Sequence, residues 1–161
     1  MSIRPAQKTD LDIVRTITHT TIGEIYPHYY PGGAVEFFLE HHSSGNISDD
    51  IMNGRVFLCL DNAQNVVGTV TVRKNEICRL FVLPGFQGNG YGKELLEFAE
   101  NRIAESYDEI VIDASLSAKS IYLKRGYKEI GYNMIKTRNN DRLCYDVMKK
   151  IVTRKKEQEL C

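Results

Sequence analysis

The segment 76–104 constrains the fold most, because a strand-like run passes through a row of glycines into a helix-like run. The apolar stretch EICRLFVLP predicts a strand that stops at Pro84, since proline cannot continue a central strand. Gly88, Gly90 and Gly92 follow at alternate positions. The residues after them place apolar side chains on one face of a helix and charged side chains on the others. This order predicts an amphipathic helix that packs on a sheet and begins in a glycine-rich segment without side chains.

The rest of the chain alternates between helix-like and strand-like runs, without an internal repeat or a break that would divide it. Helix-like runs cover residues 9–22, 34–42 and 117–126, with a further turn at 48–54. Runs of β-branched and apolar residues predict strands at residues 2–4, 55–61, 66–74, 109–115 and 143–150. A chain of 161 residues with this alternation predicts one α/β domain.

Composition and charge disfavour several kinds of partner. A chain that is 42% hydrophobic and 26% charged is typical of a globular protein. Its formal net charge of zero gives no overall field that would attract nucleic acid or an anionic membrane. No apolar stretch approaches the ~20 residues of a membrane span, and MSIRPAQKTD lacks the apolar core of a signal peptide. We therefore expect a cytoplasmic protein with no nucleic-acid or membrane partner.

The cysteines and histidines give no sign of a metal centre. The four cysteines form no CxxC pair and keep no metal-like spacing with the four histidines. We therefore expect reduced thiols and no bound metal.

Three interpretations compete for the glycine segment. A tight turn needs one or two glycines, whereas three at spacing two strip side chains from the backbone where helix N–H groups are unpaired. An anion site is favoured, because free donors and the helix dipole suit a phosphate. A P-loop would need Ser or Thr after Gly92 and Lys93, but Glu94 stands there. A dinucleotide site would need GxGxxG near the first strand, and here GxGxG follows several strands.

The pattern Gln87-x-x-Gly90-x-Gly92, after a strand that ends in Leu-Phe-Val, resembles the GNAT acetyltransferase superfamily. A second segment, ASLSAKSIYLKRGY, is similar to the family's alanine, tyrosine and Gly-aromatic segment, here Ala118, Tyr122, Gly126 and Tyr127. The resemblance extends from the first helix to the last strand. It implies an N-acetyltransferase that moves an acetyl group from acetyl-CoA to a primary amine by direct attack in a ternary complex.

The resemblance also implies an architecture. It predicts a single GNAT-like α/β domain over residues 1–149 and a charged tail over 150–161. The sheet would be mixed and mostly antiparallel, with about six to seven strands flanked by helices. Strand EICRLFV would be bulged and would splay from its parallel neighbour EIVIDAS, which leaves a notch for the pantetheine arm of acetyl-CoA. A homodimer is compatible with the family.

The same resemblance assigns cofactor contacts. The backbone of the glycine segment would cradle the pyrophosphate of coenzyme A, and strand backbone would pair with the pantetheine amides. Ser115 stands where the family often has an asparagine, and its hydroxyl has less reach. The predicted cofactor-binding residues are Leu80, Phe81, Val82, Gln87, Gly88, Asn89, Gly90, Tyr91, Gly92, Ser115 and Tyr122.

Acetyl transfer to an amine needs a deprotonated nucleophile and a proton for the leaving thiolate. Tyr122 stands where the family frequently has its general acid, and the alternative is an aromatic residue on the packing face of a helix. Glu76 is the candidate base, acting directly or through water, and the alternative is a solvent-facing carboxylate at the strand end. Cys78 could in principle accept the acetyl group in a two-step route, but buried strand cysteines are usually packing residues.

The binding site of the acceptor can be assigned only to a region of the chain. In this family the segment after the first strand usually walls the acceptor side. The candidate acceptor-binding residues there are Tyr26, His28, Tyr29 and Tyr30, with His41, His42, Glu24 and Glu36 as further members of the cluster. Each could instead bridge the loop to the core or lie on the surface. The partner is thus a small-molecule amine or a peptide acceptor, and amino acids, polyamines, aminoglycosides and protein N-termini all stay open.

A different class of function stays open as well. The chain could be a non-catalytic module that binds or senses acyl-CoA, although Tyr122 is present where a degenerate copy could have lost it. A nucleotide-binding regulator would need the Gly-Lys-Ser/Thr sequence that the glycine segment lacks.

Overall fold

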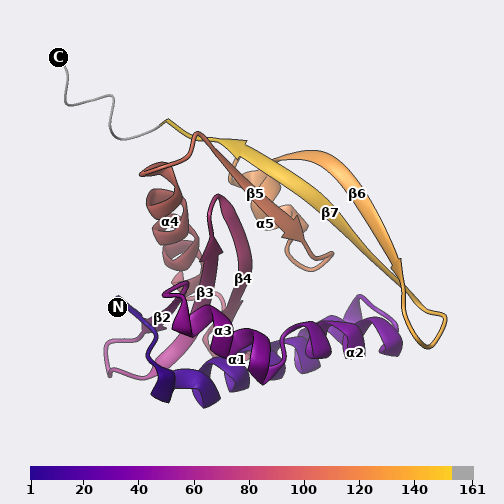
Figure 1. Cartoon of the computed structure of the whole chain (residues 1–161), viewed down its shortest axis with the longest axis horizontal. Helices are drawn as coiled ribbons and strands as arrows, with labels where there is room; N and C mark the ends of the chain where they lie inside the picture. Colours follow the sequence, from indigo (N-terminus) through magenta and orange to yellow (C-terminus); the bar gives the residue numbers. More distant parts are fainter. Residues whose placement is uncertain (154–161) are drawn as a thin grey trace.

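Seven strands form one mixed sheet with helices on both faces (Figure 1). The computed structural model describes residues 1–153. The strands are β1 (Ser2–Pro5), β2 (Val56–Leu60), β3 (Val66–Arg73), β4 (Glu76–Val82), β5 (Glu109–Ala114), β6 (Lys128–Lys136) and β7 (Arg142–Ile151), in the spatial order β1-β2-β3-β4-β5-β7-β6. The α-helices are α1 (Leu11–Ile25), α2 (Gly32–His41), α3 (Ser44–Met52), α4 (Tyr91–Ala104) and α5 (Lys119–Lys124). The predicted α/β class and mixed sheet are confirmed.

The one parallel strand pair of the described sheet is β4 with β5, and it is short. The two strands pair only at Glu76 with Val111 and at Ile77 with Ile112, and they separate beyond that point. On its other edge β4 pairs with β3, where the register shifts by one residue and leaves Cys78 bulged. The predicted bulge and the predicted splay are therefore both present, next to each other in the centre of the sheet.

The bulge decides which face of the sheet each β4 side chain occupies. Ile77 belongs to the core cluster under α4, whereas Phe81 belongs to the cluster that α1 and α2 cover. Arg79 would share the face of Ile77 in a regular strand, because side chains alternate with period two. The extra residue at Cys78 reverses this alternation, so the Arg79 guanidinium reaches Asp50 on α3 instead.

Strand β6 is an element that the sequence pattern did not predict. It is the edge strand of the sheet and forms a long hairpin with β7 (Figure 1). Almost all of its residues are exposed, including Ile130, Tyr132 and Met134. Its backbone pairing with β7, rather than a buried apolar face, therefore holds it in place.

The end of the chain only partly meets its predicted boundary. Lys150 and Ile151 belong to β7, although the predicted tail began at residue 150. Residues 154–161 of that tail lie outside the described residues. Within residues 1–153, none of the helices combines the length and the apolar character that crossing a bilayer requires.

Candidate active site

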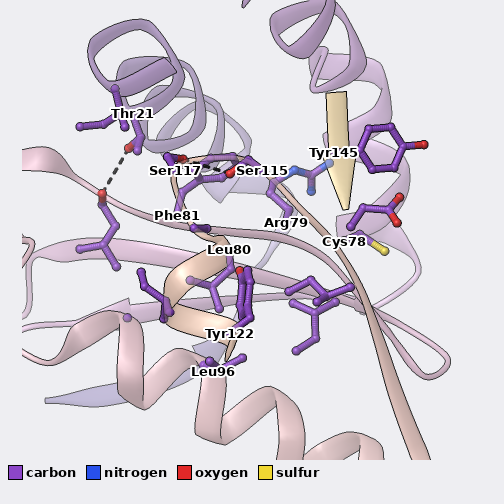
Figure 2. A pocket seen from close by; sticks show the side chains of 18 of the residues that line it. Thr21, Cys78, Arg79, Leu80, Phe81, Leu96, Ser115, Ser117, Tyr122 and Tyr145 are labelled. Atoms are coloured by element: carbon purple, nitrogen blue, oxygen red, sulfur yellow. Dashed lines mark hydrogen bonds between the residues drawn. The ribbon is translucent and has the colours of Figure 1, made fainter. Parts of the chain in front are cut away.

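A cavity of about 830 Å³ opens where β4 and β5 separate, and its wall includes residues of α1, α2, α4, α5 and the glycine segment. It brings together most of the predicted site residues, namely Tyr26, Glu76, Leu80, Phe81, Val82, Gln87, Gly88, Gly90, Gly92, Ser115 and Tyr122. Figure 2 shows Leu80, Phe81, Ser115 and Tyr122 around this cavity. The splay that breaks the central strand pair is therefore what creates the space for a ligand.

The glycine segment presents a row of free backbone donors at one end of the cavity. Gly88 and Gly90 have φ angles of +80° and +88°, a conformation that residues with a side chain rarely adopt. Among the described residues, none of the backbone N–H groups from Gly88 to Lys93 donates a hydrogen bond to the protein. Lys93 and Lys124 line the same cavity and add positive charge. Free donors, the start of α4 and two cations together fit a phosphate group.

Two of the predicted cofactor residues support this segment without lining the cavity. The Asn89 amide donates to the backbone oxygens of Phe86 and Gln87, at 3.1 and 3.2 Å. The Tyr91 ring packs edge-on against Phe86. Gln87 does line the cavity, and its side-chain amide donates to the Val82 carbonyl at 2.9 Å. The side chains of this segment therefore shape the loop, and its glycines line the cavity.

The edge of β4 supplies the second feature that fits an extended ligand. From Cys78 to Val82 the strand has no partner on the β5 side within the described sheet. Residues 78–82 line the cavity, and the Val82 carbonyl accepts from the side chains of Gln87 and Thr21. An unpaired strand edge can pair with the amides of an extended molecule as it would with another strand. The cavity thus suits a ligand that carries phosphate at one end and amides along its length.

Tyr122 stands on α5 in the middle of the cavity wall (Figure 2). Its side chain is buried, with 7% of its surface exposed, and its ring packs against Tyr127. In residues 1–153 its hydroxyl has no hydrogen-bond partner. Burial, and then the neighbouring Tyr26, raise the pKa of the phenol above its usual value. Tyr122 is therefore protonated at neutral pH and has a proton to donate into the cavity.

Two carboxylates face the cavity from the two strands that separate. Ile77 on β4 and Ile112 and Ala114 on β5 belong to the core under α4, so Glu76 and Asp113 project from the opposite face. Neither carboxylate forms a hydrogen bond or an ion pair with the part of the chain that the structure describes. Burial raises the pKa of both, and the charge of Asp113 raises that of Glu76 further. Glu76 can therefore take up a proton nearer to neutral pH than an ordinary glutamate.

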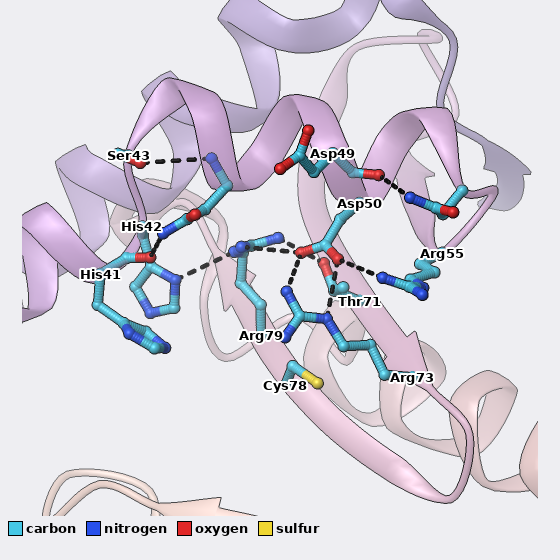
Figure 3. Close-up of polar contacts among 12 residues, drawn as sticks. His41, His42, Ser43, Asp49, Asp50, Arg55, Thr71, Arg73, Cys78 and Arg79 are labelled. Carbon is cyan, nitrogen blue, oxygen red and sulfur yellow. Dashed lines mark hydrogen bonds and ion pairs between the residues drawn. The ribbon is translucent and has the colours of Figure 1, made fainter.

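A buried carboxylate lies beside this site and gathers three arginines (Figure 3). Asp50 on α3 is fully buried, and its two oxygens accept from Nε and Nη2 of Arg73, both at 2.9 Å. Arg79 donates to it at 3.3 Å and Arg55 at 3.5 Å. The cluster therefore holds α3 to β3 and β4 through charged hydrogen bonds.

His42 is tied into the same cluster and is not available as a base. The Arg79 guanidinium donates to Nδ1 of His42 at 3.2 Å and to the Thr71 hydroxyl at 2.7 Å. Burial, and then the charge of Arg79, lower the pKa of His42 to about 2. His42 is therefore a neutral acceptor, although it lines the cavity.

The predicted acceptor residues divide between the cavity and the outside. Tyr26 lines the cavity, and burial raises its pKa to about 12. Tyr30 lies outside the cavity wall and bridges two segments, because its hydroxyl donates to the Cys144 carbonyl and accepts from the Leu116 N–H. His28 and Tyr29 also lie outside it. Of the four predicted acceptor-binding residues, only Tyr26 lines the cavity.

The structure adds residues that the sequence did not select. Arg73, Arg79 and Asp113 line the cavity, and so do the rings of Phe37, Phe38 and Tyr145. His41, a predicted member of the acceptor cluster, lines it as well. Arg73, Arg79 and Asp113 were only weakly marked in the sequence, as charged residues within or at the end of an otherwise apolar strand. That signal could not show which face of the sheet each would occupy, since the bulge at Cys78 sets the face of Arg79.

The local chemistry of Cys78 bears on the two-step route. Burial, and then the charge of Glu76, raise the pKa of the Cys78 thiol to about 12. The thiolate needed for a two-step route is therefore rare at neutral pH. Residues 1–153 contain no group of three or more histidine, cysteine, aspartate or glutamate side chains placed to hold a metal ion.

Comparisons with known proteins agree with this geometry. The model of the acetyltransferase (GNAT) domain matches residues 25–150. A GCN5-related N-acetyltransferase structure from Rhodopseudomonas palustris is 20% identical with a TM-score of 0.85, covering 94% of this chain and 95% of that one. The PaiA N-acetyltransferase of Thermoplasma acidophilum, in complex with coenzyme A, is 20% identical with a TM-score of 0.72, covering 94% and 98%. The ribosomal-protein-alanine N-acetyltransferase of Brucella melitensis is 20% identical with a TM-score of 0.67, covering 94% and 100%. A search of curated protein sequences gave no match.

Proposed function

The chain belongs to the GNAT acetyltransferase family, and from this premise we propose that it moves an acetyl group from acetyl-CoA to the primary amine of an acceptor. The amine would attack directly in a ternary complex. The observation that carries the proposal is the cavity between β4 and β5, which joins a free strand edge, a row of free amides and Tyr122 in one space. Acetyl-CoA would supply the acetyl group as a thioester.

The cofactor end of the cavity would work mainly through backbone. The free N–H groups at the start of α4 would bind the pyrophosphate, with Lys93 and Lys124 close by. The unpaired edge at Leu80–Val82 would pair with the pantetheine amides. The PaiA N-acetyltransferase, which shares the fold and is solved in complex with coenzyme A, supports this assignment.

Tyr122 is the proposed general acid. Its hydroxyl lines the cavity without a partner in the described chain, and its raised pKa keeps the proton in place at neutral pH. It would donate that proton to the sulfur of the leaving thiolate as the carbon–sulfur bond breaks. A neutral donor inside a buried wall suits this task, because a developing anion is poorly solvated there.

Glu76 is the proposed general base. It would take the proton of the attacking amine, directly or through a water molecule. Its raised pKa brings the carboxylate closer to the value that is best for a base near neutral pH. Asp113 faces the same space, and its negative charge would help to hold an acceptor that arrives as a cation.

The experiment that tests this function measures thiol release from acetyl-CoA over a panel of amines, amino acids, polyamines, aminoglycosides and N-terminal peptides. We expect release that depends on one class of amine and that Tyr122→Phe strongly reduces. Tyr127→Phe is the matched control, because Tyr127 is buried beside Tyr122 but lies off the cavity wall. A folded protein that saturates with acetyl-CoA yet releases no thiol with any amine would favour a binding module instead.

A further inference from the structure

Arg73 and Glu76 occupy opposite positions of the tight hairpin between β3 and β4 and would be expected to form an ion pair. They are register partners on either side of the two-residue turn 74–75. Val72 and Ile77, the next pair, pack into the core under α4, so both charged side chains project from the other face. Opposite residues in an antiparallel pair have Cβ atoms about 4.5–5.5 Å apart, and opposite charges there attract.

The structure does not form this pair. Both Nε and Nη2 of Arg73 donate to Asp50, at 2.9 Å each, in a bidentate arrangement (Figure 3). In the part of the chain that the structure describes, the Glu76 carboxylate has no hydrogen bond and no ion pair. The cation nearest to Glu76 along the strand pair is therefore committed to a third residue, which comes from helix α3.

Arg73 binds Asp50 rather than Glu76 because Asp50 is more deeply buried. Its side chain is fully buried, whereas Glu76 is only half-buried, so the attraction of Asp50 for a cation is less weakened by water. Burial alone would raise the pKa of Asp50, but the hydrogen bonds from Arg73 and the charge of Arg79 outweigh it, and the pKa is lowered. Asp50 is therefore ionised at neutral pH.

We propose that Asp50 is a positioning residue that keeps Arg73 from forming an ion pair with Glu76 and thereby leaves the Glu76 carboxylate available to the acceptor amine. The inference rests on the proposed function only for the role of Glu76. The charged and titratable groups that face Glu76 are Arg73 on β3, Cys78 on β4 and Asp113 on β5, with His41 of α2 beside Asp113. Burial lowers the pKa of His41, so Arg73 carries the positive charge of this group.

The test reads the titration of Glu76 directly and needs no acceptor. The protein is labelled with ¹³C at glutamate side-chain carboxyls, and the Glu76 signal is assigned by its loss in Glu76→Gln. In Asp50→Asn we expect Arg73 to swing to Glu76 and to lower the pKa of Glu76 by about one pH unit. In Asp50→Asn/Arg73→Gln the pKa should return toward the starting value. A folded Asp50→Asn protein with an unchanged Glu76 titration would overturn the proposal.

Asp50→Asn also removes the countercharge of buried Arg79, so its folding is checked first by circular dichroism. Two further variants decide the matter even if that protein does not fold. Arg73→Gln alone should raise the pKa of Glu76 only slightly, because Arg73 is bound to Asp50 and acts on Glu76 only through its charge. A rise of about one pH unit in this variant would show that Arg73 pairs with Glu76 in the native protein, which contradicts the proposal. Arg55→Gln, which removes another partner of Asp50, is the matched control and should have no effect on Glu76.

The two proposals fail separately. The carboxyl titration can contradict the positioning role of Asp50 whether or not an acceptor is known. Once an acceptor is found, the acidic limb of the rate profile should move to lower pH in Asp50→Asn and move back in Asp50→Asn/Arg73→Gln. An unmoved limb, with the expected shift in the Glu76 titration, would remove Glu76 as the base and leave the positioning of Arg73 intact.

Discussion

One end of the cavity is formed mainly by backbone groups and the other mainly by side chains. The end at the glycine segment consists of backbone, with free N–H groups at the start of α4 and an open strand edge on β4. The other end consists of charged and aromatic side chains from α2, β3, β4 and β5 and of Tyr26 after α1, with Asp50 of α3 behind them. In the proposed function the backbone groups would bind acetyl-CoA, whereas the side chains would bind the acceptor.

This difference sets what each end tolerates. A backbone site depends on conformation, so it is sensitive to substitutions that change φ and insensitive to most changes of side chain. A side-chain site depends on charge and position, so single-atom changes such as carboxylate to amide should alter it. The following changes test that division, and they begin at Tyr122, where the two ends meet.

Replacing Tyr122 with phenylalanine should have the largest effect. We expect kcat to fall roughly 100-fold, because the leaving thiolate loses its proton donor. The KM for acetyl-CoA should change little, since in the proposed function the backbone holds the cofactor. Steady-state kinetics with acetyl-CoA and the best amine of the panel measures both. Tyr127→Phe should keep kcat within about twofold, and an equal loss in the two variants would point to packing rather than proton transfer.

Replacing Glu76 with glutamine should have the next largest effect. We expect kcat/KM for the acceptor to fall about tenfold, less than usual for a general base, because water and partly deprotonated amines can substitute. Because burial and Asp113 raise the pKa of Glu76, the native rate should rise with pH through a value above that of an ordinary glutamate. The variant should lose this acidic limb. Glu36→Gln, on α2 and outside the cavity wall, is the control that should keep it.

The conformation of the glycine end was largely predictable from the sequence, and the reason is physical. Pro84 ends a strand, and the positive φ angles of Gly88 and Gly90 are conformations that glycine adopts most easily. Such preferences act locally, so they are visible in a short stretch of sequence. The bulge and splay of β4 came from the family resemblance and not from the strand pattern itself.

The acceptor end was not predictable, because its parts meet only in the folded chain. Asp50, Arg73 and Asp113 come from α3, β3 and β5, and no local pattern states that they share a face. Tyr30 was selected as a pocket residue, yet its hydroxyl is used between Cys144 and Leu116. Strand β6 was missed for a related reason, since an exposed edge strand buries no apolar face that would mark it.

Replacing Gly90 with alanine tests the claim that the cofactor end depends on conformation. The φ of +88° costs a residue with a side chain about 1 kcal/mol, although the space around an added Cβ is open. We expect the KM for acetyl-CoA to rise about fivefold with a smaller change in kcat, and the melting temperature to fall by about 3 °C. Gly23→Ala, in an exposed turn of α1 with open space around it, should stabilise the protein instead. Equal effects of the two substitutions would contradict a special role for the Gly90 conformation.

Replacing Asp113 with asparagine should have the smallest effect and gives the sharpest test of the charge at the acceptor end. Asp113 raises the pKa of Glu76, so removing its charge should move the acidic limb of the rate profile to lower pH. We expect a shift of about half a pH unit, because Asp113 is exposed and its charge is partly screened. Glu109→Gln, on the same strand but paired with Lys149, should not move the limb. A shift to higher pH would mean that Asp113 does not act on Glu76 through its charge, and the acceptor end would then need another account of how it selects a cation.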